Sequence, residues 1–273
     1  MKLIRYTIAV LAPVVGVYAD SFDIGGRLIE VPTPIGFVRV TSDMAEVKRL
    51  SDQIVDPVND TLAFYIPEAA VPAALSGQIP DLDRYFMLKV NKKLKAYTAS
   101  IAEFVDMQNS VASQNKKIFE EFKEKMPAYF DQINGNFKKE YGSDFKLGVS
   151  QMIPLEPHHK SENAFAYSMF MNVGSASQQS ASATPATATF LNTSGRILFL
   201  YSYGAEDDLA WTRESSQAWH TAILSRNTPP PQKSSRAGLD WGMVAGKAVA
   251  GAFIGGIVAL IGGIISKKKK KEG

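Results

Sequence analysis

The sequence predicts an α+β fold in which an antiparallel sheet is flanked by helices, with a cleaved N-terminal signal and one C-terminal transmembrane helix. Three observations lead to this expectation. Short segments of alternating apolar residues, typical of strands, occupy the first and last thirds of the chain. A long segment with apolar residues at helical spacing lies between them. A run of small and apolar residues near the C-terminus ends in a block of lysines.

The first 19 residues have the pattern of a secretory signal peptide. Lys2 and Arg5 provide a charged start, residues 6–17 are mostly apolar, and small residues precede the next charged side chain. An uncleaved anchor is the alternative, but Pro13 and the short apolar run argue against it. We therefore predict cleavage after Ala19, which leaves residues 20–227 as the folded domain.

The first part of this domain reads as four strands and one helix. The expected strands are residues 27–31, 37–40, 61–66 and 84–90. Leu62, Phe64 and Ile66 are expected on one face of the third strand, because side chains alternate along a strand. For the same reason, Phe86, Leu88 and Val90 are expected on one face of the fourth. A short helix capped by Asp43 should run to about residue 54, and residues 68–83 are expected to form a loop.

The middle of the domain carries its longest helical pattern. Ser100 and Glu103 match a capping box, and apolar side chains at helical spacing continue to Met126. Pro127 is expected to break or kink the helix, because its ring removes a donor and clashes with the preceding turn. A second helical segment should follow and end near Gly142.

The last part of the domain is expected to be rich in strands. These are residues 145–153, 164–173, 187–191 and 196–203. A tight hairpin is predicted at residues 192–195, and the Ser/Ala/Gln-rich residues 174–186 are predicted to form a loop. A final helix should begin after Asp208 and run to Asn227.

Residues 228–241 form a Pro/Ser-rich linker to a predicted transmembrane helix at residues 242–266. The uncharged residues 248–265 cover about 27 Å at about 1.5 Å per residue, close to the roughly 30 Å of a bilayer core. The tail at residues 267–273 is expected on the cytoplasmic side by the positive-inside rule. The residues that set this topology are Lys267, Lys268, Lys269, Lys270 and Lys271.

The predicted membrane helix has a glycine-zipper pattern. Gly251, Gly255, Ala259 and Gly263 are spaced four apart and share one helix face. Small residues at this spacing let helix backbones approach closely in lipid. The helix is therefore a candidate site of homo-oligomerisation, although glycine is common in membrane helices in general.

Charge and composition indicate an envelope location. Residues 20–241 contain 22 basic and 26 acidic residues, a net charge of −4, so the sequence offers no support for nucleic-acid binding. The chain has no cysteine. We expect a bacterial inner-membrane protein with its bulk in the periplasm. The alternative is the endoplasmic reticulum membrane with a lumenal domain, because Asn59 and Asn192 begin glycosylation sequons and Lys270-Lys271 resembles a retrieval signal.

The order of predicted elements is an extended opening, a short helix, strands, a long helix, antiparallel strands and a final helix. The opening IEVPTPIGF at residues 29–37 and the strand GRILFLYSYG before the helix WTRESSQAWHTAILSRN carry this order most clearly. In these features the chain resembles the PsbP/DcrB-like fold group, a curved antiparallel sheet flanked by helices. The resemblance implies a non-enzymatic binding or assembly factor and transfers no functional residue. The helical middle, residues 98–141, is longer than this group leads us to expect.

One turn of the sequence carries candidate metal ligands. Glu156, His158 and His159 lie together there, and imidazole and carboxylate groups bind divalent metals. Only one further histidine, His220, is available, so a solvated hairpin tip is the alternative interpretation. We predict no catalytic residue and no cofactor, because the chain lacks a Gly-x-Ser-x-Gly elbow and its acidic runs do not match a calcium loop.

A basic run lies after the fourth strand. We interpret it either as a contact with anionic headgroups or as ordinary solvated surface. Its members are Lys89, Lys92, Lys93 and Lys95.

These features predict a single-span, membrane-anchored extracytoplasmic module that is non-enzymatic and binds an envelope protein or lipid close to the bilayer. Two alternatives stay open. One is a metal-assisted hydrolase that uses the His158/His159 turn. The other is a membrane-active protein that oligomerises through its Gly-rich helix.

Overall fold

A computed structural model describes residues 19–54, 56, 58–141, 147–175 and 182–232. These residues form a mixed α+β fold whose sheets are antiparallel and flanked by helices, as the sequence predicts. The predicted signal and the predicted membrane helix lie outside the described residues, apart from Ala19. No helix in the described ranges is long and apolar enough to cross a membrane.

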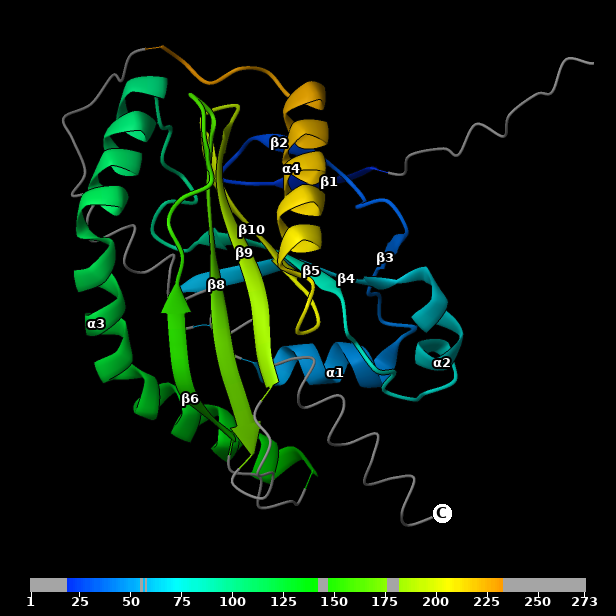
Figure 1. Ribbon diagram of the computed structural model, residues 1–273. Helices are drawn as coiled ribbons and strands as arrows, with labels where there is room; N and C mark the ends of the chain where they lie inside the picture. Colours follow the sequence, from blue (N-terminus) through cyan, green and yellow to red (C-terminus); the bar gives the residue numbers. More distant parts are fainter. Residues whose placement is uncertain (1–18, 55, 57, 142–146, 176–181, 233–273) are drawn as a thin grey trace, which may run out of the picture.

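One antiparallel sheet of eight strands organises the domain (Figure 1). The strand order is β3-β4-β5-β10-β9-β8-β6, and β7 pairs with β8 on the same edge as β6. The strands are β3 (Phe37–Arg39), β4 (Asn59–Pro67), β5 (Tyr85–Asn91), β6 (Leu147–Pro154), β7 (His159–Lys160), β8 (Ala164–Ser175), β9 (Ser182–Thr193) and β10 (Arg196–Tyr203). The neighbours β9 and β10 form a hairpin whose turn residues, Ser194 and Gly195, both have positive φ, as a type I′ turn requires.

A separate two-stranded hairpin packs beside this sheet. It consists of β1 (Ala19–Asp23) and β2 (Leu28–Pro32), joined by a turn with two positive-φ glycines, Gly25 and Gly26. The sequence predicted β2 but not β1, since ADSFD lacks the alternating apolar pattern of a half-buried strand.

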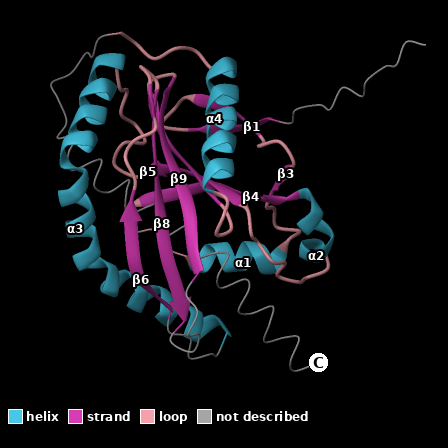
Figure 2. Ribbon diagram, viewed as in Figure 1, coloured by secondary structure: helices cyan, strands magenta, loops and turns pink. Residues whose placement is uncertain are grey.

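Helices cover both faces of the sheet (Figure 2). On one side lie α1 (Ala45–Gln53), the short η1 (Glu68–Ala70) and α2 (Val71–Leu75), and α3 (Ile101–Tyr141). On the other side lies α4 (Leu209–Arg226), next to the β1–β2 hairpin. The domain therefore has three layers.

Each face of the sheet has its own core. The core under α1 to α3 joins Leu50, Phe104 and Phe137 to aromatic side chains of the sheet such as Tyr167 and Phe190. The opposite core joins the α4 residues Trp219 and Ile223 to Ile29, Val31, Tyr65, Phe86, Leu88, Val90, Leu198 and Leu200. The predicted common face of Phe86, Leu88 and Val90 is confirmed, because all three belong to this second core.

Leu62 does not share a face with Phe64 and Ile66, and that prediction was wrong. The pairing of β4 with β5 shifts register between Thr61 and Ala63, which is a bulge. The extra residue turns Leu62 toward the α4 core, whereas Phe64 and Ile66 lie in the other core.

Two helix predictions near the N-terminal half also need correction. Met44, not Asp43, precedes α1, and no side chain caps that helix. Residues 68–83 contain η1 and α2 instead of an unbroken loop. The alanines there favour helix, and Pro72 lies in the first turn, where its missing N–H costs nothing.

The long helix α3 starts as predicted and continues through Pro127 to Tyr141, close to the predicted end. Glu103 Oε2 accepts hydrogen bonds from the backbone N and Oγ of Ser100, at 2.9 and 2.7 Å, which confirms the capping box. Pro127 lies inside one continuous helix of 41 residues. Figure 1 shows this helix bending along its length, so it is bent rather than broken.

The described residues of the predicted loop at residues 174–186 belong to strands. β8 extends to Ser175 and β9 begins at Ser182, with Val173 opposite Ser182 in the register. Small Ser, Ala and Thr side chains read as low complexity in the sequence, yet here they pair along two long strands. Likewise, the predicted turn that carries His158 and His159 contains the short strand β7.

Candidate functional site

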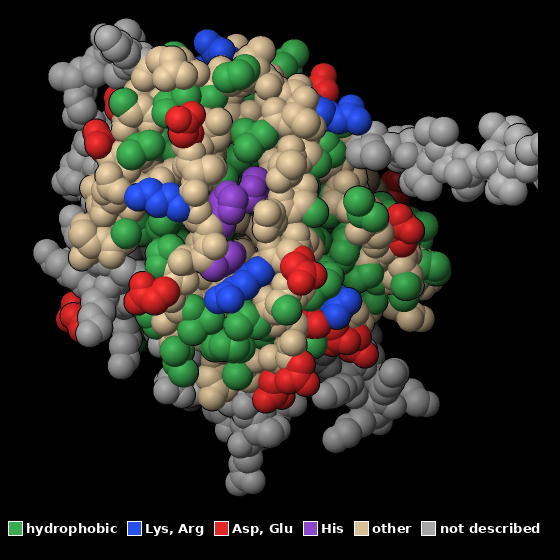
Figure 3. Space-filling view, turned by 45° about the horizontal axis from the view of Figure 1, so that its top comes forward, with side chains coloured by type: hydrophobic (Ala, Val, Ile, Leu, Met, Phe, Trp, Pro, Cys, Tyr) green, Lys and Arg blue, Asp and Glu red, His purple; other side chains and the backbone are tan. Residues whose placement is uncertain are grey.

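The three histidines of the chain gather on one face of the domain (Figure 3). His158 and His159 lie at β7, which pairs with the first part of β8, and His220 lies on α4, which packs across β8 and β9. The ring centroids of His159 and His220 are 4.9 Å apart, with an interplanar angle of 45°. We call His158, His159, His220 and the adjacent Arg213 the histidine site.

His220 is the buried member, with 4% of its surface exposed. Burial lowers its pKa to about 4, and the nearby charge of His159 acts in the same direction, while the backbone of Ser216 partly opposes them. Its Nδ1 atom is buried and makes no hydrogen bond of ordinary geometry with the described residues. The imidazole is therefore neutral at pH 7.

His158 lies closer to solvent and above a serine. Its Nδ1 is 3.5 Å from Ser168 Oγ, which also accepts a 3.1 Å hydrogen bond from Arg213 Nε. Desolvation lowers the pKa of His158, as do the charges of Arg213 and His159. Arg213 thus supplies the positive charge next to this imidazole.

A ladder of buried hydroxyl groups underlies the histidine site. Ser168 Oγ is 2.8 Å from Thr187 Oγ1, which is 3.0 Å from Thr212 Oγ1. Beside it, Thr189 Oγ1 and Ser216 Oγ are 2.7 Å apart. These bonds join β8 and β9 to the first turns of α4. They satisfy polar groups that would otherwise be costly to bury, so we assign them a structural role.

The predicted metal site is only partly assembled. Glu156 is exposed, and among the residues that the structure describes no group of three or more His, Cys, Asp or Glu side chains is placed to hold a metal ion. The fold instead brings His220 to His159, a pairing that sequence spacing did not predict. The sequence contains one hint of this pairing: it has only three histidines, and the fold brings all three to one site.

The other predicted site residues have different outcomes. Ala19 is the first residue of β1 and lies opposite Pro32. The ridge from Gly251 to Gly263 and the lysines of the tail lie outside the described residues. Lys89, part of the predicted basic run, is fully buried and forms an ion pair with Asp56 at 3.0 Å. It therefore faces neither solvent nor lipid.

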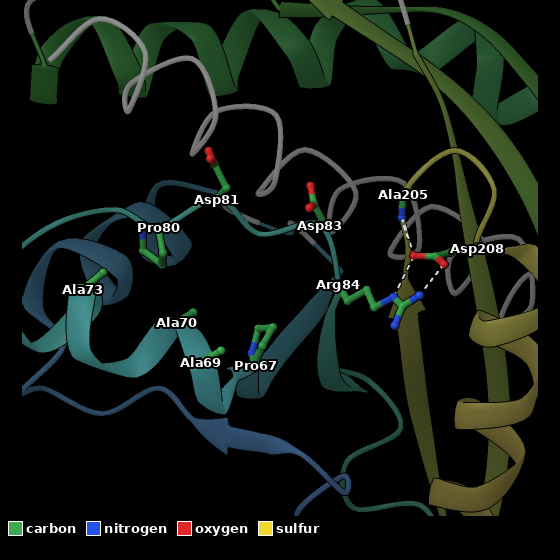
Figure 4. A pocket seen from close by; sticks show the side chains of 10 residues that line it. All are labelled: Pro67, Ala69, Ala70, Ala73, Pro80, Asp81, Asp83, Arg84, Ala205 and Asp208. Carbon is green, nitrogen blue, oxygen red and sulfur yellow. Dashed lines mark hydrogen bonds and ion pairs between the residues drawn. The ribbon is translucent and has the colours of Figure 1, made fainter. Parts of the chain in front are cut away.

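Away from the histidine site, a hollow lies between α2 and the turn before α4 (Figure 4). It has a volume of about 600 Å³, and alanines and prolines form much of its wall. At its rim, Arg84 donates two hydrogen bonds to Asp208, at 2.8 and 2.6 Å, and these lower the pKa of Asp208. Arg84 also lies 4.7 Å from the ring of Trp211. The rim is therefore held in place by a bidentate pair.

The histidine site offers donors rather than a catalytic arrangement. The Arg213 guanidinium supplies the positive charge of the site, and the imidazoles of His158 and His220, which their lowered pKa keeps neutral, are each able to donate one hydrogen bond to an acceptor group. Ser168 is fully buried and already accepts a hydrogen bond from Arg213, so it is poorly placed to attack a substrate. The arrangement fits recognition better than covalent chemistry.

Comparison with known proteins gives little further information. No protein-family description matches the chain, and no curated protein is similar to it in sequence. One similar solved structure is the crystal structure of the Ran-binding protein Mog1p from Saccharomyces cerevisiae, with 8% identity, 77% of this chain and 90% of that chain covered, and a TM-score of 0.26. The resemblance to the PsbP/DcrB-like group stays a prediction.

Proposed function

We propose that the protein is a single-span, membrane-anchored extracytoplasmic module that binds or helps assemble an envelope component close to the bilayer, without catalysis. The observation that carries the proposal is the position at which the folded domain ends. Ser194 N donates to Thr228 O at 2.9 Å, and Ile101 N donates to Pro231 O at 2.9 Å. These bonds fix Thr228 and Pro231 to the domain surface, close to the last described residue, 232.

The length of the linker supports this proposal. Residues 233–241 separate the last described residue from the apolar segment at residues 242–266. Nine residues span at most about 30 Å when fully extended, at about 3.3–3.6 Å per residue. A membrane helix at residues 242–266 would therefore keep the domain within about one domain diameter of the bilayer.

The N-terminal end is compatible with signal cleavage. Removal of residues 1–19 leaves residues 20–23 of β1 paired with β2. Asp20, the new first residue, forms an ion pair with Arg39 at 3.0 Å. Processing after Ala19 therefore costs the domain one strand residue and no ion pair.

Cell fractionation tests this proposal. The full chain should resist alkaline carbonate extraction from membranes, and its first residue should be Asp20. A variant that ends at Trp241 should be exported and released as a soluble domain. A full chain that is extracted by carbonate, or that retains Met1, would contradict the proposal.

A second candidate, a metal-assisted hydrolase, is favoured by the approach of His159 to His220. Two imidazoles whose centroids are 4.9 Å apart are able to share one metal ion, and the low pKa of His220 leaves its lone pair free of a proton at neutral pH. Zn²⁺ should then raise the melting temperature of the protein, and His159→Gln or His220→Gln should remove that increase. An equal increase in both variants would end this alternative.

A further inference from the structure

Four segments form one end of the domain, the end that carries the last described residues of the chain. They are the β1–β2 turn at residues 24–28, the loop at residues 92–98 after β5, the β9–β10 turn at residues 193–196 and residues 228–231. We call this surface the tether end. Its position is set by the fold, because β5, β10 and β9 are adjacent in the sheet.

Arg196 holds the tether end together. Its Nε and Nη2 atoms donate to the carbonyl oxygens of Ile24 and Gly25, at 2.7 and 2.8 Å. Its Nη1 atom donates to Tyr97 O at 2.8 Å and to Thr98 Oγ1 at 2.7 Å. One guanidinium thus connects three of the four segments, so the tether end is a rigid surface.

The tether end is basic in a domain that is acidic overall. Exposed cationic side chains project from Arg27 and Lys93, whereas the amine of Lys92 donates to Asp56 O at 2.9 Å. Burial and the nearby charge of Arg27 both lower the pKa of Arg196. Lys95 is neutralised by Asp60 at 3.0 Å, and Asp23, which accepts a hydrogen bond from Gly26 N, contributes one negative charge. These groups give a local excess of positive charge, whereas residues 20–241 have a net charge of −4.

Acidic side chains lie to the side of this surface. Glu30 projects from β2, where its backbone exchanges hydrogen bonds with the Asn227 side chain, and Glu162 precedes β8. In the strand order β5-β10-β9-β8, Glu162 is on the far side of the β9–β10 turn from the loop at residues 92–98. The excess of cations is therefore concentrated around the β1–β2 turn and that loop.

Leu28 adds an apolar contact to the same surface. It follows Arg27 at the end of the β1–β2 turn, and 72% of its surface is exposed. Few large apolar side chains of the described residues are so exposed. An exposed leucine next to cationic side chains is typical of proteins that rest on the headgroup region of a membrane.

We propose that the tether end docks onto an anionic bilayer surface, with Arg27 and Lys93 contacting the headgroups and Leu28 entering the interface. This inference rests on the proposed function, since it is the anchor at residues 242–266 that presents this end to the bilayer. The linker of nine residues makes the docked state accessible, and the charge of the surface complements anionic lipid. Each cation near the surface favours the docked state by about fivefold.

The absence of native cysteine allows a direct test with single-cysteine variants. Leu28→Cys marks the tether end. Leu75→Cys is the matched control, because it is an exposed leucine, with 55% exposure, on α2. α2 follows the end of β4 that is remote from the tether end, since Asn59 at the start of β4 pairs with Asn91.

In the experiment, each full-length variant is labelled with a fluorophore and reconstituted into vesicles that carry a headgroup quencher. The vesicles contain phosphatidylcholine alone or a mixture with phosphatidylglycerol. We expect strong quenching at residue 28 in the anionic vesicles, weak quenching in the neutral ones, and little quenching at residue 75 in either. Arg27→Glu/Lys93→Glu should lower the docked-to-undocked ratio by at least about 25-fold.

The outcomes separate this inference from the proposed function. If the full chain does not insert into vesicles, both fail. If it inserts but residues 28 and 75 are quenched equally, or if lipid charge has no effect at residue 28, the docking surface alone is refuted. Arg27→Glu/Lys93→Glu should fold as the wild type does, because neither side chain is buried, and circular dichroism checks this.

Discussion

Replacing Lys89 with methionine should destabilise the domain strongly. Lys89 Nζ lies 3.0 Å from Asp56 Oδ2, and the two side chains are 0% and 1% exposed. A buried carboxylate that loses its cation costs about 3–5 kcal/mol. Asp56 would keep three donors, the backbone N–H groups of Val58 and Asn59 and the Asn59 amide. We therefore expect a loss near the lower end of this range, about 3 kcal/mol.

The loss should also depend on pH in a defined direction. Burial by itself raises the pKa of Asp56, but Lys89 and Asn59 outweigh it and hold the pKa below 3.8. In the wild type, this contribution to stability is complete above pH 3.8 and is lost as the pH falls toward the lowered value. In Lys89→Met the effect of burial dominates, so Asp56 takes up a proton more easily. The difference between variant and wild type should shrink as the pH falls from 7 toward 4.

Urea unfolding of the full chain in mild detergent, followed by tryptophan fluorescence, measures both effects. Asp56→Asn/Lys89→Met should recover part of the loss, since the uncompensated charge is gone. Lys93→Met, an exposed lysine, is the control and should change stability by less than about 0.5 kcal/mol. A loss below about 1 kcal/mol in Lys89→Met, or no recovery in the double variant, would refute the reasoning.

Three further predictions follow from single contacts. The pKa of His220 is lowered to about 4, so the unfolded chain takes up a proton at this residue before the folded one does as the pH falls below 6.5. The free energy of unfolding should therefore decrease by up to about 3 kcal/mol between pH 6.5 and pH 4. His220→Gln should flatten this pH dependence in urea unfolding. Gly195→Ala should destabilise the domain by about 1–2 kcal/mol more than Gly77→Ala in thermal unfolding. Both glycines have positive φ, but only a Cβ at residue 195 would meet another side chain, Thr98 Cγ2 at 2.8 Å. Equal losses would contradict this prediction. Arg84→Ala should raise the pKa of Asp208, measurable by NMR titration, and an unchanged value would show that the bidentate pair is not formed in solution.

Local patterns predicted the fold class and most elements. The Ser100 capping box, the alternation along β5 and the turn at Ser194-Gly195 are each specified within a few residues, and each is confirmed. The bulge next to Leu62 was not predictable, because it depends on the pairing of β4 with β5. Nor was β1, whose pairing with β2 gives it a structure that its own sequence does not require.

The candidate site required the tertiary structure. Glu156 was grouped with His158 and His159 by sequence proximity, but the neighbour that the fold provides is His220, about 60 positions along the chain. Similarly, a basic run in the sequence mixes Lys89, which pairs with Asp56 in the core, with Lys93, which is exposed. Spacing along a chain does not distinguish a buried cation from a solvated one.

The membrane topology of the full chain tests the central claim most directly. Leu75→Cys and Gly273→Cys place a single thiol on the domain and on the tail, respectively, in a chain without native cysteine. An impermeant maleimide added to intact spheroplasts should label residue 75 and leave residue 273 unlabelled until the membrane is permeabilised. Labelling of residue 273 in intact spheroplasts, or protection of residue 75, would contradict an extracytoplasmic domain held by a single span.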